Sequence, residues 1–365
     1  MRLRVLGGTG MRVSPLCMGA MMLGAWGNGD HDECVRIVHA ALDAGINFVD
    51  TADVYSAGES EEIVAKALSG GRRDSVILAT KFHAPMGADP NMAGNSRRWV
   101  TRAVEDSLRR LRTDWIDLYQ VHRPDPTTDI DDTLGVLSDL VHQGKVRALG
   151  SSTFPAELVV EAQWTAEGRG RERFECEQPP YSILARDVER AVLPTCQRYG
   201  MGVIVWSPLN GGWLTGRYRQ GQPISTDTGR PSRVPERFDP GRPSVAAKLD
   251  AVEALLPIAA KAGVPLAQLA LAFVLTHPAV TSAIIGPRTM DQLTSLVGAA
   301  QVVLDDEVLD AIDEAVEPGR TIDAADLGWA PPSLTDAWRR RRPASARAGA
   351  AAESTQWRNT GRRGR

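Results

Sequence analysis

The sequence lacks the features that mark exported, membrane-bound or disulfide-linked proteins. Its most apolar run, residues 266–275, is interrupted by Gln268 and is shorter than the roughly 20 residues that a membrane-spanning helix needs. The N-terminal segment MRLRVLGGTG carries basic side chains, but no long apolar stretch follows it. We therefore expect no secretory signal and no membrane partner, and we expect a cytoplasmic location.

Cysteines and histidines are few and scattered, and the net charge is small. The cysteines, Cys17, Cys34, Cys176 and Cys196, are widely separated and form no CxxC pair. The histidines do not cluster either, so we expect reduced thiols, no disulfide framework and no metal site. The formal net charge of −3 gives no reason to expect a nucleic-acid partner for the body of the protein.

What the sequence does contain is a regular alternation of strand-like and helix-like segments. The strand-like runs lie near residues 16–19, 46–49, 75–80, 115–121, 146–150, 174–178, 202–206 and 281–285. The helical patterns cover residues 32–43, 59–68, 97–111, 130–142, 155–167, 188–199, 244–261 and 289–296. Eight such units predict an α/β fold, a closed (β/α)8 TIM barrel rather than an open sheet.

Several segments lie outside this alternation. Residues 3–13 predict a β-hairpin, because their glycines do not match the dinucleotide motif GxGxxG and no helix follows them. Residues 209–243 lack a period and predict a long loop after the seventh strand, and residues 264–277 predict an extra helix. We expect one barrel domain over residues 1–330 and a disordered, arginine-rich tail over residues 331–365.

Four reactive side chains are predicted to meet at the carboxyl ends of the strands, where barrel enzymes carry their active sites. Asp50 ends the second strand, and Tyr55 follows in the loop beyond it. Lys81 ends the third strand and His122 ends the fourth. Each residue alone has an ordinary structural explanation, such as a buried histidine at position 122, but together they suit one kind of reaction.

That reaction is the delivery of a proton to a carbonyl oxygen. A tyrosine phenol has an ordinary pKa of about 10 and needs that pKa lowered to donate a proton near neutral pH. The Lys81 ammonium would favour the phenolate of Tyr55, and Asp50 would keep the buried lysine protonated. A histidine N–H from His122 would orient the carbonyl oxygen.

Because side chains cannot supply a hydride, the same reaction implies a nicotinamide cofactor. Groups suited to its carboxamide are Ser151, Ser152 and Gln178, and Trp206 offers a flat face for the ring. Backbone amides for the pyrophosphate are expected in the runs Ser207-Pro208-Leu209-Asn210-Gly211-Gly212 and Gly286-Pro287-Arg288-Thr289. The Arg288 guanidinium suits the 2′-phosphate that distinguishes NADP from NAD.

Over nearly all of residues 1–330 the chain resembles the aldo-keto reductases. The motifs that carry the resemblance are GINFVDTADVYSAGESEE, LATKF, SLRRLRTDWIDLYQVHRPD, GKVRALGSS, QPPYSIL, WSPLNGGWLTGRY and IIGPRT. The resemblance implies reduction of an aldehyde or ketone by NADPH, with Tyr55 as proton donor, Lys81 and Asp50 tuning it, and His122 orienting the carbonyl. It implies cofactor contacts at Gly19, Met21, Asp50, Ser151, Ser152, Gln178, Trp206, Ser207, Pro208, Leu209, Gly286, Arg288, Thr289 and Gln292.

The sequence departs from the family pattern at four of the positions that bear on the cofactor. Thr153 stands where many members have Asn, Ala20 where Thr is common, Trp206 where Tyr is usual and Leu296 where an Asn often contacts adenine. Trp206 preserves stacking on the ring. The carboxamide contact at Thr153 and the adenine contact at Leu296 are the ones in question.

Two other functions compete with carbonyl reduction. Relatives in this branch similar to potassium-channel β-subunits bind NADPH mainly to sense or regulate, whereas the complete set of four side chains favours turnover. A metal-dependent hydrolase needs clustered ligands, and the strand ends offer only His122.

The predicted partner is a small carbonyl compound, and the sequence indicates no oligomeric state. The loops expected to face this substrate cover residues 26–31, 83–97 and 213–240. They carry Trp26, Trp213 and several arginines, which fit a sugar, a nucleotide sugar or an aromatic aldehyde.

Overall fold

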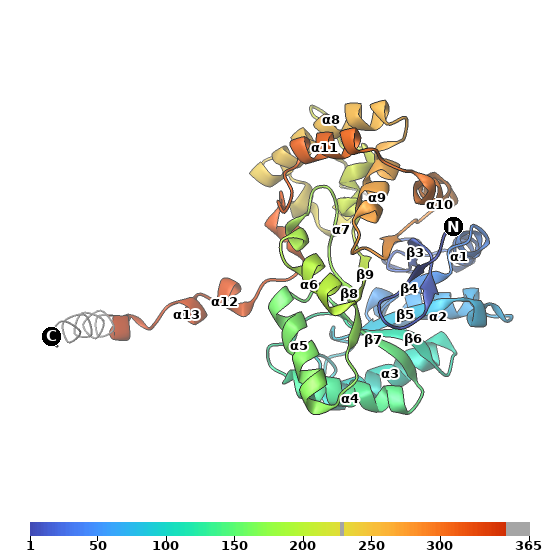
Figure 1. Ribbon diagram of the computed structural model, residues 1–365, viewed down its shortest axis with the longest axis vertical. Coiled ribbons are helices and arrows are strands. Elements are labelled where there is room, and N and C mark those ends of the chain that lie inside the picture. The colour runs from blue at the N-terminus through green and yellow to red at the C-terminus, as the bar shows by residue number, and fades with distance from the viewer. Residues whose placement is uncertain (227–229, 348–365) are drawn as a thin grey trace. The chain divides into compact units, whose positions relative to one another are not determined.

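Eight parallel strands form a closed barrel at the centre of the protein, in the order β10-β3-β4-β5-β6-β7-β8-β9 (Figure 1). The computed structural model describes residues 1–226 and 230–347, and the chain divides into two units, Met1–Leu327 and Gly328–Arg365. The strands are β3 Leu16–Gly19, β4 Phe48–Asp50, β5 Ile77–Phe82, β6 Ile116–Val121, β7 Val146–Ser152, β8 Phe174–Gln178, β9 Gly202–Val205 and β10 Ser282–Ile285. The predicted TIM barrel is confirmed.

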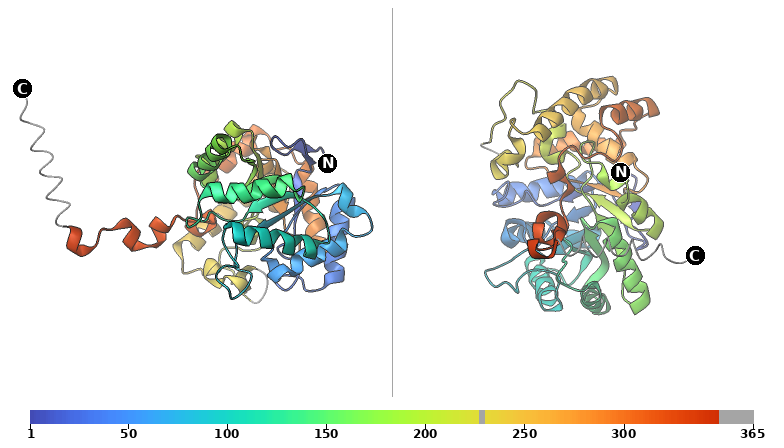
Figure 2. Two further views of the ribbon diagram at one scale, coloured as in Figure 1. Left: turned by 90° about the horizontal axis from the view of Figure 1, so that it is seen from below. Right: turned by 90° about the vertical axis from the view of Figure 1, so that its left-hand side faces the viewer.

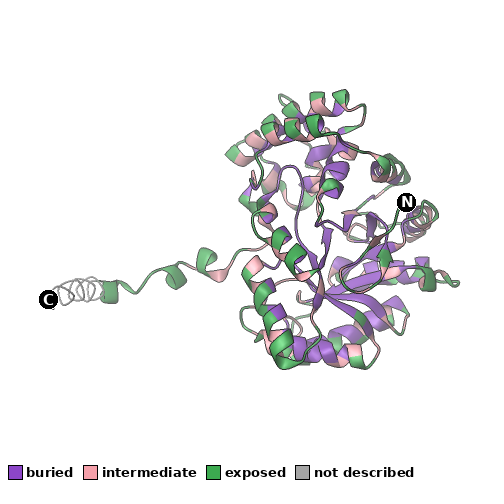
Figure 3. Cartoon of the chain, in the orientation of Figure 1, coloured by how far each residue is buried: buried purple, intermediate pink, exposed green. Residues whose placement is uncertain are grey.

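Helices surround the barrel, with their exposed faces outward and their buried faces toward the strands (Figures 2 and 3). They include α1 His31–Asp43, α2 Glu59–Ala67, α3 Arg97–Leu111, α4 Ile130–His142, α5 Ala156–Arg169, α6 Val192–Tyr199, α8 Pro243–Lys261 and α10 Met290–Val297. In α3 the Ser96 hydroxyl caps the helix by accepting from the Trp99 N–H. Val104, Leu108 and Leu111 repeat at helical spacing on the buried face, so burial of this face holds the helix against the barrel.

The predicted N-terminal hairpin is present, and it closes the bottom of the barrel. It consists of β1 Arg4–Val5 and β2 Arg12–Val13, and the Leu6 side chain between them packs with apolar side chains inside the barrel. The hairpin backbone lies close to strand β8, because a Cβ added to Gly7 would lie 2.3 Å from the Glu175 carbonyl oxygen. With this end filled, the carboxyl ends of the strands provide the opening.

The segment after β9 is less irregular than its sequence predicts. The predicted loop contains η4 Asn210–Thr215, α7 Arg230–Arg233 and η5 Pro235–Phe238. Trp213 stacks on Phe238 with ring centroids 5.3 Å apart, and both rings pack against Tyr218. These contacts between distant aromatic residues order a segment that has no local periodicity.

Helical segments near the C-terminus complete the first unit. The extra helix predicted there is α9 Leu266–Thr276, and α11 Asp306–Ala315 and η7 Ala324–Leu327 follow it. The helix predicted over residues 188–199 is split into η3 Asp187–Glu189 and α6, because the backbone of Ala191 is not helical.

The second unit holds the arginine-rich tail. Its described part includes the short helices α12 Pro332–Thr335 and α13 Ala337–Arg340. The disorder expected from residue 331 onward stays a prediction. The rest of that prediction, over residues 348–365, lies outside the described residues. Within the described chain no single helix could cross a membrane; only α8 and α9 together, bent by 88°, reach the required length and composition.

Candidate active site

Asp50, Lys81 and Tyr55 form a connected chain at the carboxyl edge of the barrel. Asp50 is the last residue of β4, Lys81 lies near the end of β5, and Tyr55 begins η1 Tyr55–Gly58. The Lys81 Nζ donates to Asp50 Oδ2 at 2.6 Å, to the Thr51 carbonyl at 2.8 Å and to the Tyr55 hydroxyl oxygen at 3.2 Å. These bonds use all three donors of the ammonium and leave the Tyr55 proton available for another acceptor.

The backbone around Tyr55 is held in an uncommon conformation. Ser56 and Ala57 have φ values of 50° and 56°, and other non-glycine residues with positive φ, such as His83, Thr153 and Ser207, also follow barrel strands. Left-handed backbone at non-glycine residues is strained and tends to collect at functional sites. Among the described non-glycine residues only Arg112, at the end of α3, departs from this concentration at one edge, which is the pattern expected of a functional site.

A pair of glutamines fixes the other oxygen of Asp50. Gln120 Nε2 and Gln178 Nε2 donate to Asp50 Oδ1 at 3.0 and 2.9 Å, and Gln178 Nε2 also lies 3.1 Å from Gln120 Oε1. We did not predict Gln120 from the sequence. Strand alternation could have found it, because it lies two residues before His122, on the same face of β6, and pairs in register with Lys81.

The electrostatics agree with one part of the prediction and correct another. Burial acts to lower the pKa of Lys81, but Asp50 and Tyr55 together outweigh it and raise the pKa above its ordinary value. The lysine therefore stays charged, as predicted. For Tyr55 the prediction of a lowered pKa is wrong in this structure, because burial raises the pKa more than Lys81 lowers it.

His122 follows β6 and faces Tyr55. The two rings are nearly perpendicular, with centroids 5.8 Å apart, and the Trp26 ring centroid lies 5.9 Å from that of Tyr55. Burial, with the charges of Lys81 and Arg123, holds the pKa of His122 well below its usual value. The imidazole is therefore neutral near pH 7 and keeps one N–H to donate.

The residues predicted to hold a carboxamide separate onto two sides of β7. The Ser152 hydroxyl donates to the Gln178 carbonyl at 2.9 Å, and the Thr153 hydroxyl accepts from Trp206 Nε1 at 3.3 Å. The Ser151 hydroxyl instead donates to Glu177 Oε2 at 2.5 Å, away from the Asp50 cluster. Burial raises the pKa of Glu177 to about 7.

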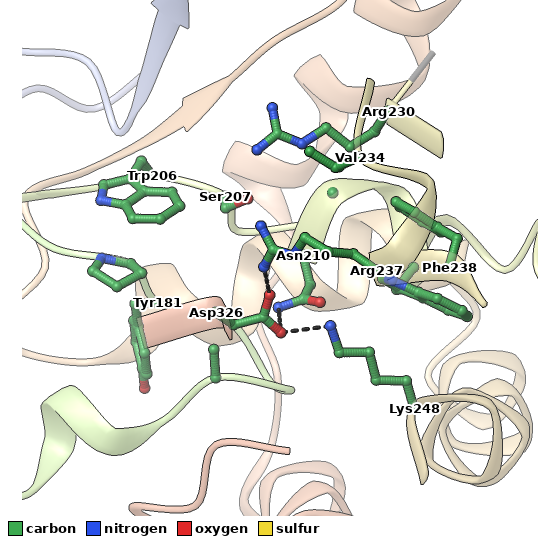
Figure 4. A pocket seen from close by; sticks show the side chains of 14 residues that line it. Tyr181, Trp206, Ser207, Asn210, Arg230, Val234, Arg237, Phe238, Lys248 and Asp326 are labelled. Atoms are coloured by element: carbon green, nitrogen blue, oxygen red, sulfur yellow. Dashed lines mark hydrogen bonds and ion pairs between the residues drawn. The ribbon is translucent and has the colours of Figure 1, made fainter. Parts of the chain in front are cut away.

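The backbone of residues 207–212, which follow β9 and are called the cradle below, turns repeatedly through left-handed conformations. Ser207, Asn210, Gly211 and Gly212 all have positive φ, and Pro208 and Leu209 lie between them. Such turns can direct N–H groups to one concave surface, although here the Asn210 and Gly212 N–H groups donate to the Ser207 and Leu209 carbonyls at 2.8 and 3.0 Å. The buried Asn210 Oδ1 has no partner within the described structure; as a carbonyl oxygen it can accept from a donor but does not bind an anion. Together with Trp206, Asn210 and Gly211 line a pocket (Figure 4).

The turn before α10 is fixed by its own side-chain hydrogen bonds. Thr289 caps α10 by accepting from the Gln292 N–H, and the Arg288 N–H donates to Gln292 Oε1 at 2.8 Å. Asn28, which the sequence did not single out, donates to the Arg288 carbonyl at 2.9 Å. Gly286 opens this turn after β10, and its position is exposed.

Two further predicted residues lie at the end of β3. Gly19 pairs in register with Asp50, and a Cβ there would lie 2.5 Å from Ile284 Cγ2. Met21 follows, partly exposed, just beyond the strand. Within residues 1–226 and 230–347 no three His, Cys, Asp or Glu side chains are grouped to hold a metal ion, and the four cysteines are free and buried.

Comparison with known proteins agrees with this architecture. Residues 15–317 match the model of the aldo/keto reductase family. The chain is 39% identical to the uncharacterized oxidoreductase YrpG of Bacillus subtilis over 86% of this chain and 95% of YrpG. It is 36% identical to a probable voltage-gated potassium channel subunit beta of Oryza sativa, over 88% of this chain and 99% of that protein. It is 35% identical to norsolorinic acid reductase B of Aspergillus parasiticus, over 84% and 82% of the two chains.

The family match covers the whole barrel, including every strand that contributes to the Asp50–Lys81–Tyr55 chain. This family of oxidoreductases uses nicotinamide cofactors and acts on small carbonyl compounds. By its barrel and its sequence relatives, the chain belongs to the aldo/keto reductase family.

Proposed function

We propose that this protein reduces an aldehyde or ketone to an alcohol with NADPH. The observation that carries the proposal is the Asp50–Lys81–Tyr55 chain at the open end of the barrel, with His122 facing the phenol. NADPH, when bound, supplies the hydride for the carbonyl carbon. Every other part of the reaction is assigned to side chains of the protein.

The four side chains divide the proton chemistry among them. Tyr55 donates its proton to the carbonyl oxygen, because Lys81 occupies only the acceptor side of the phenol. The charged Lys81 stabilises the tyrosinate that remains after transfer, and Asp50 holds that charge in place. His122 donates its N–H to the same oxygen and fixes its position.

The raised pKa of Tyr55 is compatible with this role. A phenol that is protonated throughout the neutral range is ready to donate, and the adjacent ammonium offsets the charge that develops. Because burial strengthens electrostatic interactions, the Lys81 charge acts more strongly on tyrosinate here than it would in water.

The cofactor contacts follow from the same edge of the barrel. We assign Ser152, Thr153 and Gln178 to the carboxamide of the nicotinamide, and we place Trp206 beside the nicotinamide ring. Ser151 takes an indirect part, because its hydroxyl is bonded to Glu177. The positive-φ run from Ser207 to Gly212 is assigned to the pyrophosphate, and the turn at Arg288 to the 2′-phosphate.

A second function has some support. Probable potassium channel β-subunits of Oryza sativa and Arabidopsis thaliana are 36% and 35% identical to this chain. A protein that binds NADPH and regulates a partner would need the cofactor site but would not need turnover at Tyr55.

Removing the Tyr55 hydroxyl separates these two functions. In Tyr55→Phe we expect kcat/KM for carbonyl reduction to fall by roughly 10³-fold or more, because the proton donor is lost. NADPH affinity, measured by fluorescence titration, should stay within about twofold, since the ring remains. The assay is carbonyl-dependent loss of NADPH absorbance over a panel of aldehydes, ketones and keto-sugars. Turnover in the variant equal to wild type would exclude Tyr55 as donor; tight NADPH binding without turnover in wild type would favour the regulatory function.

A further inference from the structure

The wall of the cradle pocket is built around a buried carboxylate, Asp326, from the C-terminal segment (Figure 4). Its Oδ1 pairs with Arg237 Nη2. Its Oδ2 lies 2.6 Å from Lys248 Nζ and accepts from Asn210 Nδ2 at 3.1 Å. Lys248 is only 1% exposed and Asp326 only 7% exposed, so these bonds are shielded from water.

The three partners of Asp326 come from separate parts of the chain. Asn210 lies in the cradle, Arg237 lies in η5 of the segment over the pocket, and Lys248 lies in α8. One carboxylate therefore joins the cradle and the segment above it to the helix layer.

Asp326 itself is fixed by backbone pairing to the barrel side. Thr321 forms an antiparallel bridge with Ala185, and the Ile322 N–H donates to the Leu184 carbonyl at 3.0 Å. The Asp326 N–H donates to the Asp323 carbonyl at 2.8 Å. The carboxylate is thus an anchored group, and the loop residues bind to it.

Two of the cations in this pocket, Lys248 and Arg237, face carboxylates, and Arg230 is a third cation in its lining. Asp323 Oδ2 lies 3.7 Å from Lys248 Nζ, so two carboxylates face the two cations Lys248 and Arg237. A phosphate is not required to balance Lys248 and Arg237. This favours a structural role for the cluster over direct contact with the cofactor.

We propose that Asp326 is a positioning residue that holds the cradle and residues 230–238 closed over the nucleotide and so limits how fast NADPH leaves. The inference rests on the proposed NADPH function. Asp326 acts through Asn210, whose left-handed backbone (φ 49°) begins the turn at Gly211 and Gly212. Without the carboxylate, Asn210 keeps only a long contact of 3.4 Å to Ser182 Oγ, and Arg237 loses its partner.

The test is stopped-flow measurement of NADPH release, with the full-length protein. In Asp326→Asn and Arg237→Met we expect the dissociation rate to rise about tenfold or more, with a small change in the association rate. Combining the two substitutions should add less than about twofold, because both break the same link. Arg237→Met leaves the buried Lys248–Asp326 pair intact, so it remains informative if Asp326→Asn does not fold.

Arg219→Met serves as the matched control. Arg219 belongs to the same segment and forms a paired contact with Glu253 of α8 at 2.8 Å, but it does not contact Asp326 or the cradle. Its release rate should equal that of wild type within about twofold.

Two outcomes would overturn the inference, and they are distinguishable. Unchanged release in Asp326→Asn and Arg237→Met, with a lower melting temperature, would make the cluster structural only. A rise of equal size in Arg219→Met would mean that any loosening of the segment has the same effect. If wild type did not bind NADPH at all, the proposed function itself would fail.

Discussion

At the scale of single residues, the Arg288 side chain can be substituted without disturbing the turn in which it lies. Its N–H and carbonyl are held by Gln292 and Asn28, so substitution removes only the guanidinium. In Arg288→Ala we expect the Kd for NADPH to rise roughly ten- to a hundredfold, because a charge-assisted contact to the 2′-phosphate is lost. Fluorescence titration with NADH, which lacks that phosphate, should change by less than about twofold. Equal weakening of both cofactors would remove the assignment.

Asp53 is a second residue whose behaviour can be predicted, this time in stability. Asp53 is 1% exposed, and the Val54 backbone N–H only partly offsets the cost of burying its charge. Burial, with the charge of nearby Glu61, raises its pKa from 3.8 to about 8. Since the folded pKa is the higher one, the native state binds the proton more tightly, and stability falls as pH rises between about 4 and 8.

Asp53→Asn removes this ionisation, so the variant should be more stable than wild type above about pH 8. The gain should be on the order of several kcal/mol, at about 1.4 kcal/mol per pKa unit, and should shrink toward pH 4. Urea unfolding at pH 5 and pH 8.5 measures it. Asp117→Asn is the opposing control, because Asp117 pairs with Arg73 and accepts from the Leu78 N–H, and its loss should destabilise. A pH-independent effect of Asp53→Asn would contradict the prediction.

At the scale of elements, the backbone of the N-terminal hairpin lies in close contact with the bottom of the barrel. A Cβ at Gly7 (φ +52°) would meet the Glu175 carbonyl at 2.3 Å, whereas at Gly10 (φ +74°) nothing lies within 4 Å. Both glycines need left-handed backbone, which costs about 1–2 kcal/mol for another residue. Gly7→Ala should therefore lower the free energy of unfolding by clearly more than Gly10→Ala does, as judged by urea denaturation. Similar losses would show that the hairpin adjusts its distance from the barrel.

Elements also show how far sequence reasoning reaches. The strands at 16–19 and 174–178 were predicted to the residue, because each is short, apolar or β-prone and ends in a clear break. β5 was predicted at 75–80 but covers Ile77–Phe82, which places Lys81 within the strand. The aromatic cluster of Trp213, Tyr218 and Phe238 has no local signal, since it depends on packing between residues that are distant in sequence.

The candidate site, like the fold, was predictable from the sequence only in part. That Tyr55, Lys81, Asp50 and His122 lie together at one edge was predictable, because each ends a strand or follows one. The second oxygen of Asp50 is held by Gln120, on the strand beyond β5, and recognising this requires the barrel register. The net pKa of Tyr55 was not predictable either, because it depends on how completely the folded chain buries the phenol.

At the scale of the whole molecule, the first unit should be sufficient for function. It ends at Leu327, just after Asp326. A stop codon after residue 327 should leave NADPH binding and turnover within about twofold of the full chain, whereas a stop after residue 320 removes both Asp323 and Asp326 and should raise the NADPH dissociation rate. Purified truncations compared by stopped flow and steady-state kinetics would check this. Loss of activity in the longer truncation would assign a function to the tail.

The order of the strands has a consequence for how the protein is made. The first barrel strand, β3, pairs on one side with β4 and on the other with β10, where Leu16 faces Ala283. During synthesis the edge of β3 that pairs with β10 stays unpaired until β10 has left the ribosome. An exposed strand edge is a place where other chains can add. The nascent protein therefore carries an aggregation hazard that disappears only when its last strand arrives, and chaperone demand should be greatest during that interval.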